Sequence, residues 1–291
     1  MLTDEPKPPE SGARLDERYL QLLKHMLTRS GFQPETIYQE INVGRHPAIL
    51  GWAIRSAQYL LARRSIRLMG VRRYDPAQRE VGADWPDMAE TMVGLRRLDA
   101  LQACLETIFK DNVPGDILEA GVWRGGSSIF MRGVLAVHNE NDRHSWLADS
   151  FMGVPAPDVA NYPADEGMLL HTFRQLAVPK DEVRRNFERY DLLDENVHFL
   201  EGWFKDTLPG APIGRLALLR LDGDLYESTI LPLEALYDKV SPGGFVVIDD
   251  YYNIEPCRRA TDTFRQENEI MEPVEKIDWC GAFWRKGYPS G

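Results

Sequence analysis

Aspartate residues follow two strongly apolar stretches in the second half of the chain, and they are the side chains most suited to chemistry. Asp222 and Asp224 come after the run RLALLRL, and Asp249 and Asp250 come after GGFVVI. In an open parallel sheet, ligands bind beyond the carboxyl ends of the strands, so these carboxylates should meet at one rim. A divalent cation would relieve their repulsion, and oxygen ligands favour magnesium, calcium or manganese over zinc. We therefore predict a metal site formed by Asp222, Asp249 and Asp250.

Helix capping is the alternative role for these acids. Any single aspartate could instead cap one of the helices expected to begin near Tyr226 and Ile254. For the three residues taken together, we favour the metal site.

A glycine-rich turn at residues 121–126 is the second stretch that suits ligand binding. Apolar strand residues precede it, and the small residues Ser127 and Ser128 follow at the start of an apolar helical run. The order of strand, turn and helix is typical of the first half of a dinucleotide-type α/β unit, in which Gly121 would let a ligand approach the backbone. Glu119 lies where a diphosphate site would require bare backbone, so a cationic ligand fits better.

Asp149 ends the next apolar stretch, HSWLAD. It lies about one βαβ unit after the turn, where an acidic residue can bind the two hydroxyls of a ribose. A helix cap or turn aspartate is an alternative of comparable weight. Residues 153–166 contain prolines, a glycine and few apolar anchors, which is typical of a mobile lid.

Composition restricts the class of protein. The chain has 291 residues, of which 43% are hydrophobic, so it can form one large domain plus an accessory segment. A formal net charge of -11 argues against binding nucleic acid or an anionic membrane surface. Three cysteines without C-x-x-C spacing indicate neither a disulfide framework nor a zinc site, and no apolar run reaches the roughly 18 residues of a membrane span. We expect a cytoplasmic protein that acts on a small molecule.

Six motifs between residues 90 and 284 together resemble the macrocin O-methyltransferase (TylF-type) family. Each motif alone is weak, but their joint occurrence in this order is specific. No such motif lies before Pro86. The motifs are ETMVGLRRL (90–98), LEAGVWRGG (118–126), ADSF (148–151), GWFKDTLP (202–209), LDGDLYEST (221–229) and VIDDY (247–251).

The resemblance implies a class I methyltransferase fold of the α/β class. This is a Rossmann-like, doubly wound, mostly parallel seven-stranded sheet with an antiparallel last strand, and strand patterns near 272–278 and 281–286 would supply its closing hairpin. The resemblance also implies S-adenosylmethionine as methyl donor and Mg²⁺ as cofactor. The implied acceptor is a hydroxyl of a deoxysugar on a glycosylated natural product such as a macrolide or aminocoumarin. A non-sugar hydroxyl of a catechol-type small molecule is the alternative.

S-adenosylmethionine has an ammonium group, a carboxylate and an adenosine, and residues of these motifs suit each. Glu119 would face the ammonium, and Asp149 would bind the ribose hydroxyls. Thr91 and Met92, placed at the start of a helix, would hold the carboxylate through backbone N–H groups. Trp203 would cover the adenine, although tryptophan is also a common core residue. The remaining candidates for donor binding are Gly121, Ser127, Ser128, Ser150 and Asp222.

The expected reaction is an in-line displacement whose difficulty is that a sugar hydroxyl is hardly ionised at neutral pH. A bound cation lowers the pKa of a coordinated oxygen and fixes its position. Asp224 stands two residues beyond the metal ligand Asp222, on the same side if the strand continues, so it is free to take the proton. We predict Asp224 as the catalytic base, with a structural role as the alternative. His171 is a weaker candidate for a second base.

We divide the chain into three parts. Residues 1–14 are polar and should form a disordered tail. Residues 15–85 contain two helical patterns, Leu15–Leu27 and Ala48–Leu61, with more apolar surface than a flanking tail needs. We hypothesise that this N-terminal helical segment covers the acceptor site and forms a homodimer contact. Residues 86–291 form the methyltransferase domain.

Two functions of other classes share part of this pattern. An NAD-linked dehydrogenase is opposed by the missing third glycine of the fingerprint and by the three aspartates. A non-catalytic metal-binding protein is opposed by the presence of Asp224 beside Asp222.

Overall fold

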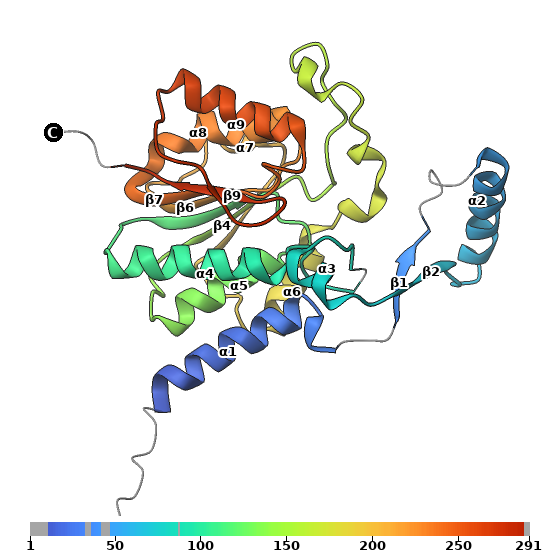
Figure 1. Ribbon diagram of the computed structural model, residues 1–291, viewed down its shortest axis with the longest axis horizontal. Coiled ribbons are helices and arrows are strands. Elements are labelled where there is room, and N and C mark those ends of the chain that lie inside the picture. Colours follow the sequence, from blue (N-terminus) through green and yellow to red (C-terminus); the bar gives the residue numbers. More distant parts are fainter. Residues whose placement is uncertain (1–10, 33–35, 42–46, 87, 288–291) are drawn as a thin grey trace, which may run out of the picture.

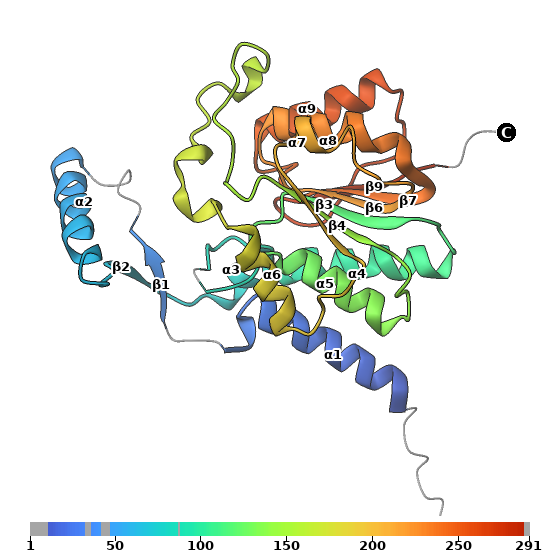
Figure 2. The same cartoon turned by 180° about the vertical axis from the view of Figure 1, so that it is seen from behind.

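The computed structural model describes residues 11–32, 36–41, 47–86 and 88–287. A central sheet lies between two layers of helices, and one segment projects away from this body (Figures 1 and 2). None of the helices in the described ranges is long and apolar enough to cross a membrane.

The sheet has seven strands, as expected. Strands β5, β4, β3, β6 and β7 are parallel to one another, and β9 runs antiparallel to its neighbours β7 and β8. The expected closing hairpin is therefore confirmed. In spatial order the strands are β5 (Val197–Glu201), β4 (Ser145–Asp149), β3 (Asp116–Ala120), β6 (Leu216–Leu221), β7 (Val240–Ile248), β9 (Ala282–Arg285) and β8 (Glu275–Lys276).

Strand order places the ligand-binding edge. Along the chain, β3 is the first strand of this sheet, and β4 and β5 are added on one side of it. The next strand, β6, lies on the other side of β3. The direction of winding thus reverses between β3 and β6, and ligands of such sheets bind outside the carboxyl ends of the strands at this point. The glycine-rich turn and the aspartates predicted to do chemistry all follow strands at this edge.

Helices cover both faces of the sheet (Figure 1). Each layer forms its own hydrophobic core with one face of the strands. On one face lie α4 (Leu95–Lys110), α5 (Gly126–Val137) and α6 (Lys180–Arg189), and on the other lie α7 (Phe204–Thr207), α8 (Tyr226–Leu236) and α9 (Glu255–Glu267).

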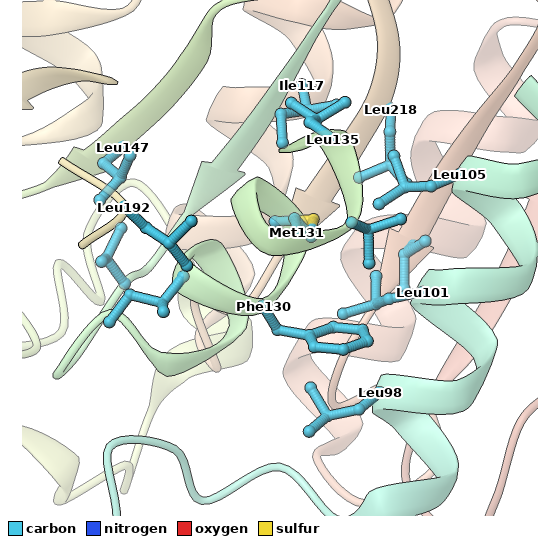
Figure 3. Packing of buried hydrophobic residues seen from close by; sticks show 14 of the residues in the cluster. Leu98, Leu101, Leu105, Ile117, Phe130, Met131, Leu135, Leu147, Leu192 and Leu218 are labelled. Carbon is cyan, nitrogen blue, oxygen red and sulfur yellow. The ribbon is translucent and has the colours of Figure 1, made fainter. Parts of the chain in front are cut away.

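Close packing between α4 and α5 fixes the glycine-rich turn, which leads into α5. Leu98, Leu101 and Leu105 recur at three- and four-residue spacing, so they share one face of α4. Figure 3 shows this face packed toward Phe130 of α5 and Leu218 of β6. All five side chains are buried. Truncating one such leucine to alanine typically costs about 2–5 kcal/mol, so this contact holds the turn firmly.

The first N-terminal helix belongs to the body of the domain. Helix α1 (Ser11–Leu27) begins inside the range 1–14 that was expected to be a tail, of which residues 1–10 lie outside the described residues. Leu20, Leu23 and Leu27 are buried in the core shared with α4 and α5. Lys24 Nζ lies 2.6 Å from Asp99 Oδ1 of α4. Part of the apolar surface of α1 is therefore buried within the chain, whereas Leu15 and Leu22 remain exposed.

The second N-terminal helix has the opposite character. Strand β1 (Thr36–Glu40) pairs antiparallel with β2 (Met69–Arg73), and α2 (Ala48–Ala62) lies beyond this hairpin, away from the body (Figures 1 and 2). We call the described residues of this segment, 36–41 and 47–73, the arm. Its helix exposes 86% of Ile49 and 69% of Trp52. Short helix α3 (Pro76–Val81) then returns the chain to the body.

Candidate active site

Three carboxylates converge at the carboxyl ends of β6 and β7. Asp222 directly follows β6, and its backbone N–H donates to the carbonyl of Ala120 in β3 at 2.8 Å. Asp250 lies one residue further from the sheet than Asp249, which follows β7. Oxygen atoms of Asp222, Asp224 and Asp250 all lie within 4.8 Å of one another. The structure thus brings together two of the three predicted metal ligands and the predicted base.

A backbone turn, not a continued strand, places Asp224 in this triplet. Strand β6 ends at Leu221, and Asp224 adopts a left-handed backbone conformation with φ 63°. Such a conformation is unfavourable for a residue with a Cβ and occurs mostly where the surrounding structure enforces it, often at functional sites. Asp224 was expected on the same side as Asp222 through a continued strand, and it lies beside Asp222 and Asp250 through this turn instead.

Asp249 lies behind the triplet and is held by two arginines. Its Oδ1 accepts a hydrogen bond from Arg220 Nη2, and its Oδ2 accepts one from Arg97 Nη1. Arg220 Nη2 also donates to Asp222 Oδ2 at 3.0 Å. Both oxygens of Asp249 are thus engaged by positively charged groups, and an oxygen of Asp249 also lies within 4.8 Å of ligand atoms of Asp250 and Cys280, so its role as a metal ligand stays a prediction.

The pKa values differ between the three converging carboxylates and the arginine-paired Asp249. Burial and the neighbouring Asp222 raise the pKa of Asp224 to about 7. Burial and repulsion between carboxylates also raise the pKa values of Asp222 and Asp250. Burial acts in the same direction on Asp249, but the two arginines outweigh it and lower its pKa. Carboxylates held together against their repulsion are an arrangement that a divalent cation stabilises.

Glu119, expected to face a ligand ammonium, is paired inside the protein. The residue is only 1% exposed. Its Oε1 accepts a hydrogen bond from Arg220 Nη1, and its Oε2 accepts one from the hydroxyl of Ser128. The charge of Glu119 is thus compensated by Arg220, and Ser128 orients its carboxylate. Glu119 also lines the larger of the two cavities described below, so its contact with an ammonium group stays a prediction.

Gly121 and Asp149 shape the turn after β3. Gly121 has φ 88°, and a Cβ there would clash with the carbonyl oxygen of Asp222. Asp149 Oδ2 accepts from the backbone N–H of Val122 at 2.7 Å, and its Oδ1 accepts from that of Phe151 at 2.8 Å. The glycine therefore permits close approach of two strand ends, and the aspartate braces the turn from the neighbouring strand.

Thr91 and Met92 do not begin a helix, which corrects that expectation. Helix α4 begins at Leu95, and the segment before it packs against the first turn of α5, where Gly126 N–H donates to the carbonyl of Glu90 at 3.0 Å. Thr91 Oγ1 lies 3.4 Å from Ser127 Oγ. The helix dipole of α4 is therefore displaced from these two residues.

Two adjoining cavities meet at the carboxylates. The smaller, of about 260 Å³, is lined by Met92, Gly121, Asp149, Ser150 and Trp203 among others. A larger cavity of about 690 Å³ is lined by Thr91, Ser127 and Asp250 among others. Met92, Asp222 and Asp224 line both. Most of the residues predicted to bind a cofactor thus surround one compartment, with a second compartment beside the predicted base.

Aromatic side chains form part of the larger cavity's wall. The rings of Trp85 and Phe173 stack with centroids 6.0 Å apart, and both residues line this cavity together with Trp279. Indole Nε1 of Trp279 donates to the carbonyl of Val81 at 2.7 Å. His171 is exposed in the turn Leu170–Thr172 next to this wall. The wall joins the segment after α3 to the segment after β4.

Arg97 and Arg220 contact the site carboxylates but were not predicted as site residues, although Arg97 lies within the motif at 90–98. Arg220 is the one charged residue in the otherwise apolar run of β6, LALLRL. A charge within a buried strand must be paired, so its position was a usable signal that acidic partners lie nearby.

Comparison with known proteins agrees with the motifs. The sequence model of the macrocin-O-methyltransferase (TylF) family matches residues 16–286. The chain is 57% identical, over 72% of its length and 81% of the relative, to 8-demethyl-8-(2,3-dimethoxy-alpha-L-rhamnosyl)-tetracenomycin-C 4'-O-methyltransferase from Streptomyces olivaceus. It is 51% identical to demethyldecarbamoylnovobiocin O-methyltransferase from Streptomyces niveus, over 73% of this chain and 82% of that one.

A solved structure is similar over most of the chain. The structure of the O-methyltransferase NovP is 42% identical and superposes with a TM-score of 0.80. The similarity covers 94% of this chain and all of that one (100%). Because the family match begins at residue 16, it includes most of α1 and the whole arm, which lie before the recognised motifs.

Proposed function

Because the chain belongs to the macrocin-O-methyltransferase (TylF) family, we propose that this O-methyltransferase methylates a deoxysugar hydroxyl of a glycosylated natural product, with S-adenosylmethionine as donor and Mg²⁺ as cofactor. Membership of an O-methyltransferase family excludes the two alternative functions, an NAD-linked dehydrogenase and a non-catalytic metal-binding protein. The observation that carries the proposal is the meeting of a smaller and a larger cavity at Asp222 and Asp224.

The smaller cavity fits the donor. It lies at the strand ends where sheets of this kind bind nucleosides, and it is bounded by Trp203, which offers a flat apolar face for a purine. Asp149 and Ser150 line it at the end of β4, next to where a ribose would lie. The donor supplies an electrophilic methyl group on a sulfonium. Ser150 Oγ donates to the Gly153 carbonyl at 2.9 Å and so fixes the segment after β4 that lines the smaller cavity.

Asp222 and Asp250 are the residues that we propose would hold Mg²⁺. They are common to the set predicted from the sequence and to the triplet in the structure, and their oxygens suit this ion. When bound, such an ion lowers the pKa of a hydroxyl oxygen and fixes its position. Asp224, with its pKa near neutrality, would take the proton from the acceptor hydroxyl. Asp249, held by Arg97 and Arg220, would support the ligands from behind.

The larger cavity would take the acceptor. Its volume of about 690 Å³ suits a sugar with part of its aglycone, and exceeds what a catechol-sized molecule would fill. Trp85, Phe173 and Trp279 offer apolar faces to a sugar ring or a flat aglycone. Given the 57% identity to the tetracenomycin enzyme, we propose a rhamnose-type sugar as acceptor. A catechol-type acceptor remains the alternative for this site.

A second copy of the chain would cover the arm. The described part of the arm exposes eight large apolar residues: Ile49, Leu50, Trp52, Tyr59, Leu60, Ile66, Leu68 and Val71. Large apolar residues exposed together on one projecting segment are typical of an interaction surface, and homodimers are the commonest assembly that buries one. We therefore propose a homodimer whose contact includes the outer face of α2.

Calorimetry with separate ligands tests the donor and metal assignments. Titration with S-adenosylhomocysteine should release heat and raise the melting temperature, and Mg²⁺ should bind to the same protein independently. NAD is the control nucleotide and should do neither. Binding of NAD without binding of S-adenosylhomocysteine would contradict the proposal.

A further inference from the structure

Arg220 occupies an unusual position for a charged residue. It is the fifth of the six residues of β6, within the sheet core, and its side chain is only 1% exposed. Its guanidinium contacts carboxylates that follow or end three adjacent strands: Glu119 of β3, Asp222 after β6 and Asp249 after β7. One side chain thus joins the ends of the three strands that form the centre of the site.

We propose that Arg220 is a positioning residue for methyl transfer, which sets the places of Asp222 and Asp249 and so prepares the rim to bind Mg²⁺. The inference rests on the magnesium requirement of the proposed function. Arg220 lies within β6, one residue before the strand ends, and its guanidinium donates to carboxylates at the carboxyl ends of the strands.

The hydrogen-bond pattern supports positioning over simple charge balance. Nη2 is shared between Asp222 and Asp249, so a single nitrogen fixes the spacing of two carboxylates from different strands. Nη1 is held by Glu119, which is itself held by the Ser128 hydroxyl. The guanidinium is therefore anchored on one side and directs its other nitrogen toward the rim.

A second arginine completes the arrangement around Asp249. Arg97, from the first turn of α4, donates to the Asp249 oxygen that Arg220 does not contact. Its Nε lies 3.2 Å from Asp278 Oδ2, which comes from the turn before β9. Asp249 is thus fixed from two directions, whereas Asp222 receives one bond from the pair. This makes the position of Asp222 the more dependent on Arg220.

Guanidinium geometry is essential to this role. An arginine presents a planar fork of donors that can bridge several carboxylates at once, whereas a lysine ammonium is a single point charge on a flexible stem. Groups that orient metal ligands in this way typically contribute about 10- to 100-fold to metal affinity. Arg220→Lys keeps the charge and loses the fork, so it separates positioning from charge balance.

The test compares Mg²⁺ and S-adenosylhomocysteine binding in the same variants by calorimetry. Arg220→Lys should weaken Mg²⁺ binding by about 10- to 100-fold and lower kcat, while affinity for S-adenosylhomocysteine and KM for the donor stay unchanged. Glu119→Gln, which releases the anchor of Arg220, should weaken Mg²⁺ binding in the same direction. If Arg220→Lys binds Mg²⁺ as tightly as the native protein, the inference is wrong.

Arg132→Met is the matched control. Arg132 is also buried, and its guanidinium pairs with Asp194 before β5, at the opposite edge of the sheet. This change should lower the melting temperature without altering Mg²⁺ affinity. An equal loss of Mg²⁺ affinity in Arg132→Met and Arg220→Lys would show a general structural effect and overturn the positioning role. If the native protein binds no Mg²⁺, the magnesium requirement itself fails, which is a distinct result.

Discussion

Asp149 should contribute both to stability and to donor binding, and the two contributions can be measured separately. Its carboxylate accepts two short backbone hydrogen bonds, from Val122 at 2.7 Å and from Phe151 at 2.8 Å. Asp149→Ala leaves both N–H groups without this acceptor. Each orphaned buried donor costs about 1–3 kcal/mol, so the free energy of unfolding should fall by about 2–6 kcal/mol. Since domains of this kind have about 5–15 kcal/mol in total, the variant should still fold at low temperature.

Asp149→Asn reduces the structural cost, because the amide keeps one carbonyl oxygen as acceptor. Urea unfolding measures the stability of each variant, and calorimetry with S-adenosylhomocysteine measures donor affinity. Asp116→Ala is the control: that carboxylate accepts from His144 N–H and Trp146 Nε1, both at 3.0 Å, at the opposite edge of the sheet. The control should lose stability but not donor affinity. Unchanged donor affinity in folded Asp149→Asn would remove Asp149 from the donor site.

Three further predictions concern the metal, the base and the arm. Asp224→Asn should bind Mg²⁺ and S-adenosylhomocysteine but turn over about 10²- to 10⁴-fold more slowly. Asp249→Ala should lose both activity and its response to Mg²⁺. Measuring kcat against Mg²⁺ concentration distinguishes the two variants. Because the pKa of Asp224 is raised to about 7, the metal-free fold prefers its protonated carboxyl. The contribution of this carboxyl to the free energy of unfolding is therefore lost as pH rises through about 7. The increase in melting temperature caused by Mg²⁺ should accordingly be larger above that pH than below about pH 5, and an equal increase would contradict the raised pKa. Light scattering should find a dimer that Trp52→Glu converts to a monomer, and a native monomer at micromolar concentration would refute the proposed contact.

Local sequence patterns predicted individual strands and the residues at their carboxyl ends, whereas the seven-stranded arrangement was implied by the family resemblance. Apolar runs such as the one ending at Leu221 identify buried strands, and the acids that follow them mark the carboxyl ends. The closing hairpin near Ala282–Arg285 was likewise readable from its strand pattern. These features depend on residues close together in the chain.

Features that depend on distant residues were not predictable in this way. Asp249 is paired with Arg97, which lies 152 positions earlier in the chain, and no local pattern connects the two. Asp224 joins Asp222 through a left-handed turn, although an extended strand was assumed. Thr91 was placed on a helix because the apolar spacing of α4 extends beyond its true start at Leu95. Each difference arises where tertiary contacts or backbone turns override spacing.

Methylation of matched acceptors distinguishes transfer to a sugar hydroxyl from transfer to another hydroxyl. The protein would be incubated with labelled S-adenosylmethionine, Mg²⁺ and three acceptors: a rhamnosylated tetracenomycin-type compound, its sugar-free aglycone and a catechol. We expect that label passes only to the sugar of the glycoside, that EDTA abolishes the transfer and that added Mg²⁺ restores it. Transfer to the catechol or the aglycone in preference to the glycoside, or transfer at the native rate in EDTA, would contradict this expectation.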